Sequence, residues 1–308
     1  MRATFLFIAL AATSAAAAQP ETKLPWKDAV PTPPAVAASP EFAKAVMPPV
    51  MVALPGMDDL QIWREIDYAG SSDPFVRMDV YAPRNKARGK RPAVFFLHGG
   101  VGTNGQAKDW GIYQSWGRLA AASGLVGVTF THRLGYPETK VTEGAADVAA
   151  AITHVRTNAS AYGIDPDRLC VAAFSAAGPL LSPYMTGAPE HVRCLVSVYT
   201  FLDIRQTKEH QASESPETRD AYSPILKLAS AGRKTPLLLV RAGNDTIPTL
   251  LDSMDRFAVE ALKTDYPVTL INLPGAPHGF DNKAWSPRGE EAILQVLSFF
   301  KQHLVAKQ

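Results

Sequence analysis

The sequence is poor in cysteine, in long apolar runs and in excess charge of one sign, and each shortage excludes a class of protein. Only two cysteines stand among 308 residues, and no Cys/His spacing is typical of a zinc site. The formal net charge is +2, so nothing favours nucleic acid or an acidic surface as a partner. We see no internal repeat. With 46% hydrophobic residues, the chain can form one large core or at most two domains.

The first 18 residues have the pattern of an export signal. Arg2 supplies a positive start, residues 5–12 are mostly apolar, and residues 16–18 are small alanines that precede Gln19. The apolar run is too short to remain as a permanent membrane helix. We therefore expect cleavage and export to the periplasm or the medium, with no stable membrane span afterwards. A retained N-terminal anchor is the alternative.

The remaining chain divides into an arm and one domain. Residues 19–58 are rich in proline and alanine, which predicts an extended arm on the surface. Residues 59–308 form the domain. At its start, residues 62–68 and 75–81 alternate between apolar and polar, and the turn residues 70–74 connect them. This pattern predicts an antiparallel pair of strands.

Strands and helices then alternate. Apolar runs predict strands at residues 93–97, 125–130, 169–174, 192–199, 236–241 and 268–273. Helical patterns cover residues 113–122, 141–160, 249–263 and 287–303. This alternation predicts an α/β fold with a mostly parallel twisted sheet, helices on both faces and right-handed connections.

Four groups that could carry chemistry follow predicted strands. They are Ser175 after residues 169–174, Asp245 after 236–241, His278 after 268–273, and the turn His98-Gly99-Gly100 after 93–97. A parallel sheet places its working groups at the carboxyl ends of its strands, so we expect them to lie together. Their chain order, Ser, Asp, His, is that of α/β-hydrolases.

These residue types suit nucleophilic catalysis. The Ser175 hydroxyl would need a base, and His278 could take its proton and return it to the leaving group. Asp245 would fix the imidazole tautomer and stabilise the imidazolium. Asp203 and Asp252 are alternative acids. Such chemistry requires no metal and no cofactor.

The negative oxygen of a tetrahedral intermediate would need main-chain N–H donors, and losing one raises the barrier by about 3 kcal/mol. Ala176, directly after the nucleophile, supplies one. The turn Gly99-Gly100-Val101 can supply others, because glycine allows the backbone to approach a ligand closely. We expect His98 to orient this turn and not to react.

The nucleophile segment departs from the G-x-S-x-G pattern, because Ala173 and Ala177 replace both glycines and Gly178 comes one place late. The serine of such a turn has a strained backbone, so both methyl groups must be accommodated. Pro179 and Pro183 interrupt the helix that should follow. We expect that helix to be short or distorted.

Together the motifs resemble the α/β-hydrolase superfamily, in particular its esterase branch of hormone-sensitive-lipase-like and dienelactone-hydrolase-like enzymes. The similar segments are His98-Gly99-Gly100-Val101-Gly102, residues 132–138, residues 162–169, Ala242-Gly243-Asn244-Asp245 and His278-Gly279-Phe280. The resemblance covers roughly residues 60 to 304. It implies oxyanion donors at Gly100, Val101 and Ala176, and hydrolysis of small to medium carboxylic esters through an acyl-serine intermediate.

Two questions stay open on the sequence alone. The fold also serves serine peptidases, and the altered serine turn would suit a catalytically silent binding protein. Cys170 and Cys194 stand in strands that could be neighbours. They could pair in an oxidising compartment, or be two small buried hydrophobic residues.

Overall fold

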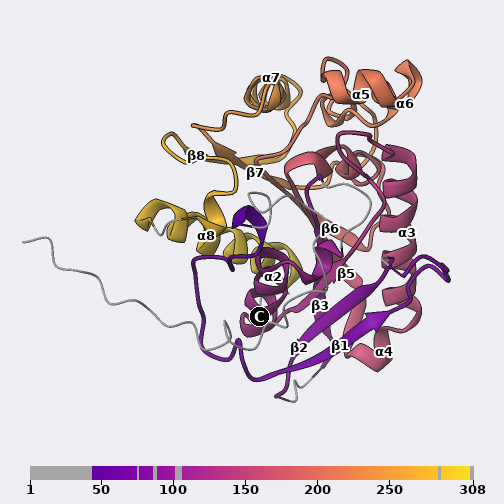
Figure 1. The fold of residues 1–308 in the computed structure, drawn as a ribbon, viewed down its shortest axis with the longest axis vertical. Helices are drawn as coiled ribbons and strands as arrows, with labels where there is room; N and C mark the ends of the chain where they lie inside the picture. Colours follow the sequence, from indigo (N-terminus) through magenta and orange to yellow (C-terminus); the bar gives the residue numbers. More distant parts are fainter. Residues whose placement is uncertain (1–43, 75, 86–88, 101–105, 284–285, 306–308) are drawn as a thin grey trace, which may run out of the picture.

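A computed structural model describes residues 44–74, 76–85, 89–100, 106–283 and 286–305 of the chain. At its centre is one eight-stranded sheet in the order β1-β2-β4-β3-β5-β6-β7-β8 (Figure 1). The strands are β1 (Leu60–Ile66), β2 (Met78–Pro83), β3 (Arg91–Leu97), β4 (Val126–Phe130), β5 (Ile164–Phe174), β6 (Val192–Val198), β7 (Leu237–Ala242) and β8 (Val268–Leu273). The last six are parallel to one another, whereas β1 and β2 pair antiparallel, as the sequence predicted.

Helices cover both faces of the sheet. They are α2 (Gly111–Ala122), α3 (Val141–Thr157), α4 (Ala159–Tyr162), α5 (Lys208–Ser213), α6 (Pro216–Ala221), α7 (Leu250–Lys263) and α8 (Pro287–Leu304). Alternate residues of β3 face opposite sides: Phe95 packs in the core under α3 and α7, and Phe96 packs in the core under α2 and α8. Both aromatic side chains are buried, which explains why this strand is apolar throughout. The predicted α/β architecture is confirmed.

The segment between β6 and β7 contains more structure than the sequence indicated. The short helices α5 and α6 lie beside the start of α3 (Figure 1). There the Glu214 carboxylate accepts a hydrogen bond from the Val141 N–H (2.7 Å). A helix of one to two turns shows no periodicity that could be recognised in a sequence. The predicted helix over 141–160 likewise divides into α3 and α4.

The described end of the proline-rich arm, residues 44–58, packs more deeply than a surface arm. Val50, Val52 and Met57 are buried against α2 and α8. The Val50 N–H donates to Ser115 Oγ (2.8 Å), and the Met51 N–H donates to the Asp281 carbonyl (2.7 Å). These residues are therefore part of the core. The segment expected to be an export signal lies outside the described residues, as does the rest of the arm.

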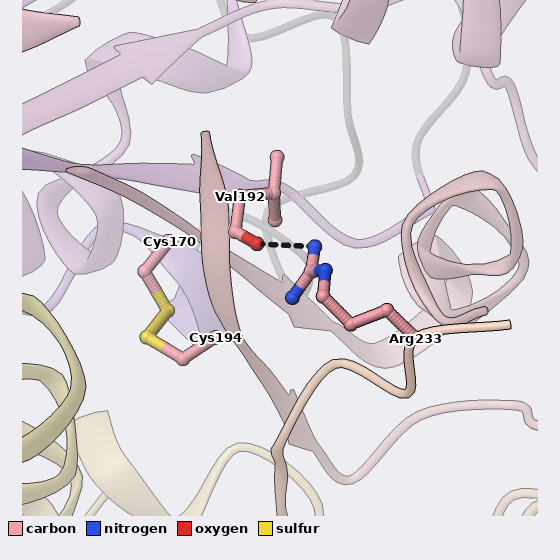
Figure 2. The surroundings of a disulfide bond; sticks show 4 residues. All are labelled: Cys170, Val192, Cys194 and Arg233. Atoms are coloured by element: carbon pink, nitrogen blue, oxygen red, sulfur yellow. Dashed lines mark hydrogen bonds between the residues drawn. A yellow bond between two sulfur atoms is a disulfide. The ribbon is translucent and has the colours of Figure 1, made fainter. Parts of the chain in front are cut away.

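The two cysteines form a disulfide that joins β5 to β6 (Figure 2). Cys170 and Cys194 are register partners on these parallel neighbours, with their Cα atoms 4.8 Å apart. This answers the question that the sequence left open. Beside the bond, the Arg233 guanidinium donates to the Val192 carbonyl (3.0 Å) and ties the start of β6 to the chain before β7 (Figure 2).

Within the described ranges, no helix combines the length and the apolar character that a bilayer crossing requires.

Candidate active site

Ser175 stands where β5 ends and a 3₁₀ helix, η3 (Ser175–Tyr184), begins. Its φ is 53°, in the left-handed region that residues other than glycine seldom adopt. The Ser175 carbonyl accepts a hydrogen bond from the Phe201 N–H (3.2 Å), which holds this conformation in place. Ser175 is half-buried between fully buried neighbours. A strained serine at a strand-to-helix turn is the arrangement that presents a nucleophile above a parallel sheet.

Packing explains why the glycine of this turn comes one place late. Both Ala173 and Ala177 are fully buried, and their methyl groups are accommodated. A Cβ at Gly178, in contrast, would lie 2.0 Å from the Phe201 carbonyl oxygen. The chain after β6 thus approaches the turn at residue 178 and requires glycine there.

The helix after Ser175 contains Pro179 and Pro183 and is a 3₁₀ helix over its whole length. Each proline removes one main-chain donor and clashes with an α-helical turn. The distortion that the sequence predicted is therefore confirmed.

The structure brings Asp245 and His278 together. His278 Nδ1 lies 2.6 Å from Asp245 Oδ2, and the Asp245 side chain is fully buried. The carboxylate also accepts from the Ile247 N–H (2.9 Å). The loops that carry the two residues are joined by the Asn244 N–H, which donates to the Ala276 carbonyl (2.9 Å). Because a carboxylate accepts, Nδ1 carries the proton, and Nε2 is left to act as a base.

The two alternative acids lie elsewhere. Asp203 binds Arg205 (2.8 Å) and Arg256 (2.6 Å), and Asp252 is exposed and binds Arg256 (2.9 Å). Burial would raise the pKa of Asp203, but hydrogen bonds from these two arginines lower that pKa to about 2. Asp203 therefore serves as the centre of an ion-pair cluster.

The glycine turn after β3 lies against the serine turn. A Cβ at Gly99 would lie 2.9 Å from Ser175 Cβ, and one at Gly100 would lie 2.9 Å from Ala176 Cβ. Glycine at both positions allows this close approach. The Ala176 N–H belongs to the first turn of η3, where main-chain donors have no partner within the helix. Val101, the third expected donor, lies outside the described residues.

His98 is buried, and its contacts fit the orienting role that we expected. Its Nδ1 donates to the Gly99 carbonyl (2.7 Å), and its Nε2 accepts from the His132 N–H (3.0 Å). Burial lowers the pKa of His98 to about 4, so the ring is neutral at pH 7. The Gly99 N–H donates to the Tyr113 hydroxyl (2.6 Å). The turn is thus fixed from two sides.

Sequence reasoning missed three residues at this site. The Tyr199 ring lies 4.7 Å from the His278 ring, and the Tyr199 hydroxyl donates to buried Asp281 (2.7 Å). Tyr136 packs its Cβ against Gly100. Burial and the nearby Glu209 carboxylate raise the pKa of Tyr136 to about 12. Tyr199 ends a predicted strand and Asp281 follows His278 by three residues, but neither position belongs to a motif.

No grouping of three or more His, Cys, Asp or Glu side chains that could hold a metal ion occurs in the part of the chain that the structure describes.

A family model and a relative of known name both indicate similarity to esterases. The family model BD-FAE, which describes α/β-hydrolase esterases, matches residues 78–222. Esterase LipC of Mycobacterium tuberculosis is 27% identical over 68% of this chain. The aligned region spans 58% of that relative, so the chain corresponds to little more than half of its length.

Two solved structures share the fold. A truncated carbohydrate esterase from gut microbiota has a TM-score of 0.67 at 18% identity, over 82% of this chain and 100% of the other. Esterase B of Lactobacillus rhamnosis, solved with a tributyrin phosphonate, has a TM-score of 0.69 at 16% identity, over 85% of this chain and 89% of the other. This chain therefore has the α/β-hydrolase fold, and its sequence is similar to those of esterases.

Proposed function

We propose that this protein is a serine hydrolase that cleaves small to medium carboxylic esters through an acyl-Ser175 intermediate. The observation that carries the proposal is the geometry at four strand ends. Ser175 has a strained φ of 53°, the Gly99-Gly100 turn packs against it, and Asp245 holds His278 at 2.6 Å. The similarity to several esterases supports the same reaction class.

In this mechanism Ser175 Oγ attacks the ester carbonyl while His278 Nε2 takes the hydroxyl proton. The oxygen that becomes negative would accept from the N–H groups of Ala176, Gly100 and Val101. His278 then protonates the departing alcohol, and the acyl group stays on Ser175. Water, deprotonated by His278, attacks the acyl-serine, and the acid is released as the serine regains its proton.

Export is part of the proposal. Residues 1–18 have the composition of a cleavable signal. The disulfide between Cys170 and Cys194 supports an oxidising compartment, because such bonds persist outside the reducing cytosol. Detection of mature protein that begins near Gln19 in a periplasmic or extracellular fraction would test it. Full-length protein in the cytosolic fraction would contradict it.

The decisive test is Ser175→Ala with a short-chain p-nitrophenyl ester and a fluorophosphonate probe. We expect hydrolysis to fall by at least about 10⁴-fold and labelling to disappear. Ser182→Ala is the matched control, since Ser182 is a buried serine of the same helix whose Oγ has no hydrogen-bond partner among the described residues. It should keep both signals. Full activity in Ser175→Ala would end the proposal, and a wild-type protein that neither hydrolyses nor labels would be a binding protein.

A further inference from the structure

Asp281 is a buried carboxylate that no step of the proposed mechanism uses. It lies in the turn η5 (Phe280–Asn282), three residues after His278, and is fully inaccessible to solvent. Its Oδ2 accepts from Trp116 Nε1 (2.8 Å), and its Oδ1 accepts from the Tyr199 hydroxyl (2.7 Å). Burying a carboxylate in this way costs free energy unless other groups compensate for its charge, so its presence here requires an explanation.

Tyr199 connects this carboxylate to His278. Its ring centroid lies 4.7 Å from that of His278, with the planes inclined by 60°. Tyr199 is itself buried and fixed, since its N–H donates to the Val240 carbonyl (2.9 Å) and its φ is 41°. The hydroxyl bond to Asp281 then determines the orientation of the ring. One face of the imidazole is therefore bounded by a side chain that cannot move freely.

The charge of the Asp281 carboxylate is not balanced by a fixed cation among the described residues. No Lys or Arg forms an ion pair with Asp281 within the described ranges of the chain. Each carboxylate oxygen instead accepts from one neutral donor, and the Trp116 N–H can only donate. Two such donors suit the ionised form, and an imidazolium at His278 would supply the missing positive charge.

We propose that Asp281 and Tyr199 are positioning residues that hold the His278 ring and stabilise its protonated form. The inference rests on the proposed function. A phenol that donates to a carboxylate has an electron-rich ring, and an aromatic ring within about 6 Å of a cation attracts it. His278 becomes cationic only as Ser175 attacks, so this support acts on the transition state more than on the resting enzyme.

Several ionisable groups surround Asp281, Tyr199 and His278, and each could affect a pH titration of this site. Asp281 interacts with Tyr199, Tyr113 and His278, and Asp245 interacts with His278 and Tyr199. Tyr113 and Tyr199 are buried, which raises their pKa values and keeps both neutral near pH 7. Burial raises the pKa of the Asp281 carboxyl, and the hydrogen bonds from Tyr199 and Trp116 act against that shift.

Asp281→Asn tests the proposal, because the amide keeps the shape and can still accept from Trp116, while the Tyr199 hydroxyl can reverse to accept from its NH₂. We expect kcat/KM for the p-nitrophenyl ester to fall about tenfold, mainly through kcat. The acid limb of the pH profile should move down by about half to one pH unit, since a nearby negative charge raises the pKa of a histidine. Tyr199→Phe, which keeps the ring and removes its anchor, should change both quantities in the same direction and by less.

Asp203→Asn is the control, because Asp203 is also a fully buried carboxylate with side-chain donors but does not contact His278. It should leave the acid limb unchanged. The pKa of His278, followed by NMR of ring-labelled histidine, gives a readout that needs no turnover. An unchanged His278 pKa in Asp281→Asn would overturn the inference and leave the esterase proposal standing. A wild-type protein that the fluorophosphonate does not label would instead refute the esterase proposal. The NMR titration of His278 would still decide the inference about Asp281.

Discussion

At the scale of single residues, the site depends on which side chain each buried carboxylate binds. Asp245 and Asp203 are both buried aspartates near the carboxyl edge of the sheet, and sequence order alone does not separate them. In the structure Asp245 binds the His278 ring, and Asp203 binds two arginines. The first arrangement orients an imidazole, whereas the second ties the chain after β6 to helix α7.

This difference predicts the effects of two matched variants. Asp245→Asn should reduce kcat by about 10⁴-fold with little loss of stability, because the amide favours the wrong tautomer of His278. Asp203→Asn should lower the free energy of unfolding, because it weakens two ion pairs that a buried carboxylate makes with partly exposed arginines, while kcat changes by only a few fold. Kinetics and urea unfolding of both proteins measure this. The opposite pattern would make Asp203 the catalytic acid.

Gly178 gives a second prediction at this scale. Gly178→Ala would place a methyl group against the carbonyl oxygen of Phe201. The N–H of the same residue, Phe201, donates to the Ser175 carbonyl, so a shift there would disturb the serine turn. We expect a loss of about 1–3 kcal/mol in the free energy of unfolding, together with a lower kcat. Ala177→Gly, which restores the usual motif spacing, should keep kcat and lose about 1 kcal/mol from helix propensity alone. Equal kcat values in the two variants would show that the serine turn does not depend on Gly178.

At the scale of elements, the long periodic segments could be predicted from the sequence and the short ones could not. The strand over 268–273 and the helix that begins at Pro287 lie where their patterns indicated. Helices α5 and α6 have too few residues to show a period. The same reasoning applies to the site. Strand ends predicted that Asp245 and His278 would lie together, as they do, whereas the contact of Tyr199 with Asp281 joins residues 82 positions apart and leaves no local pattern.

The link between β5 and β6 gives a prediction for one pair of elements. The disulfide closes a loop with a sequence separation of 24, which corresponds to about 3 kcal/mol of stability through reduced entropy of the unfolded chain. Cys170→Ala combined with Cys194→Ala should therefore lower the free energy of unfolding by that amount. The loss would be measured as a lower urea midpoint. Dithiothreitol should produce a similar shift in the wild type and none in the double variant. A double variant as stable as the wild type would contradict a stabilising role.

At the scale of the whole molecule, several buried neutral histidines make the fold sensitive to acid. Burial lowers the pKa of His98 and of His210 to about 4 each, and His210 has no partner for either ring nitrogen among the described residues. The unfolded chain, with histidine pKa values near 6.5, binds more protons between these limits. The stability that the neutral rings of His98 and His210 contribute is therefore fully present above about pH 6.5. This contribution is lost as the pH falls toward 4.

We expect the free energy of unfolding to decrease across this window by on the order of 3 kcal/mol for each histidine. His210→Leu removes one such group without deleting a hydrogen bond, so its stability should fall less steeply between pH 6.5 and 4. Urea unfolding at several pH values measures both slopes. Parallel slopes would exclude His210 as a source of the acid sensitivity.

The hydrogen bonds from the arm to the end of the chain have a consequence for the order in which the protein assembles. Asn282 Nδ2 donates to the Ala45 carbonyl (2.6 Å) across a sequence separation of 237, and Met51 pairs with Asp281. The first described residues to leave the ribosome thus find their partners only after nearly all the others have been made. Contacts so distant form slowly because a long loop must close. The turn that follows His278 is fixed at this late stage, so the candidate site is incomplete until Asn282 has been made and can reach the arm.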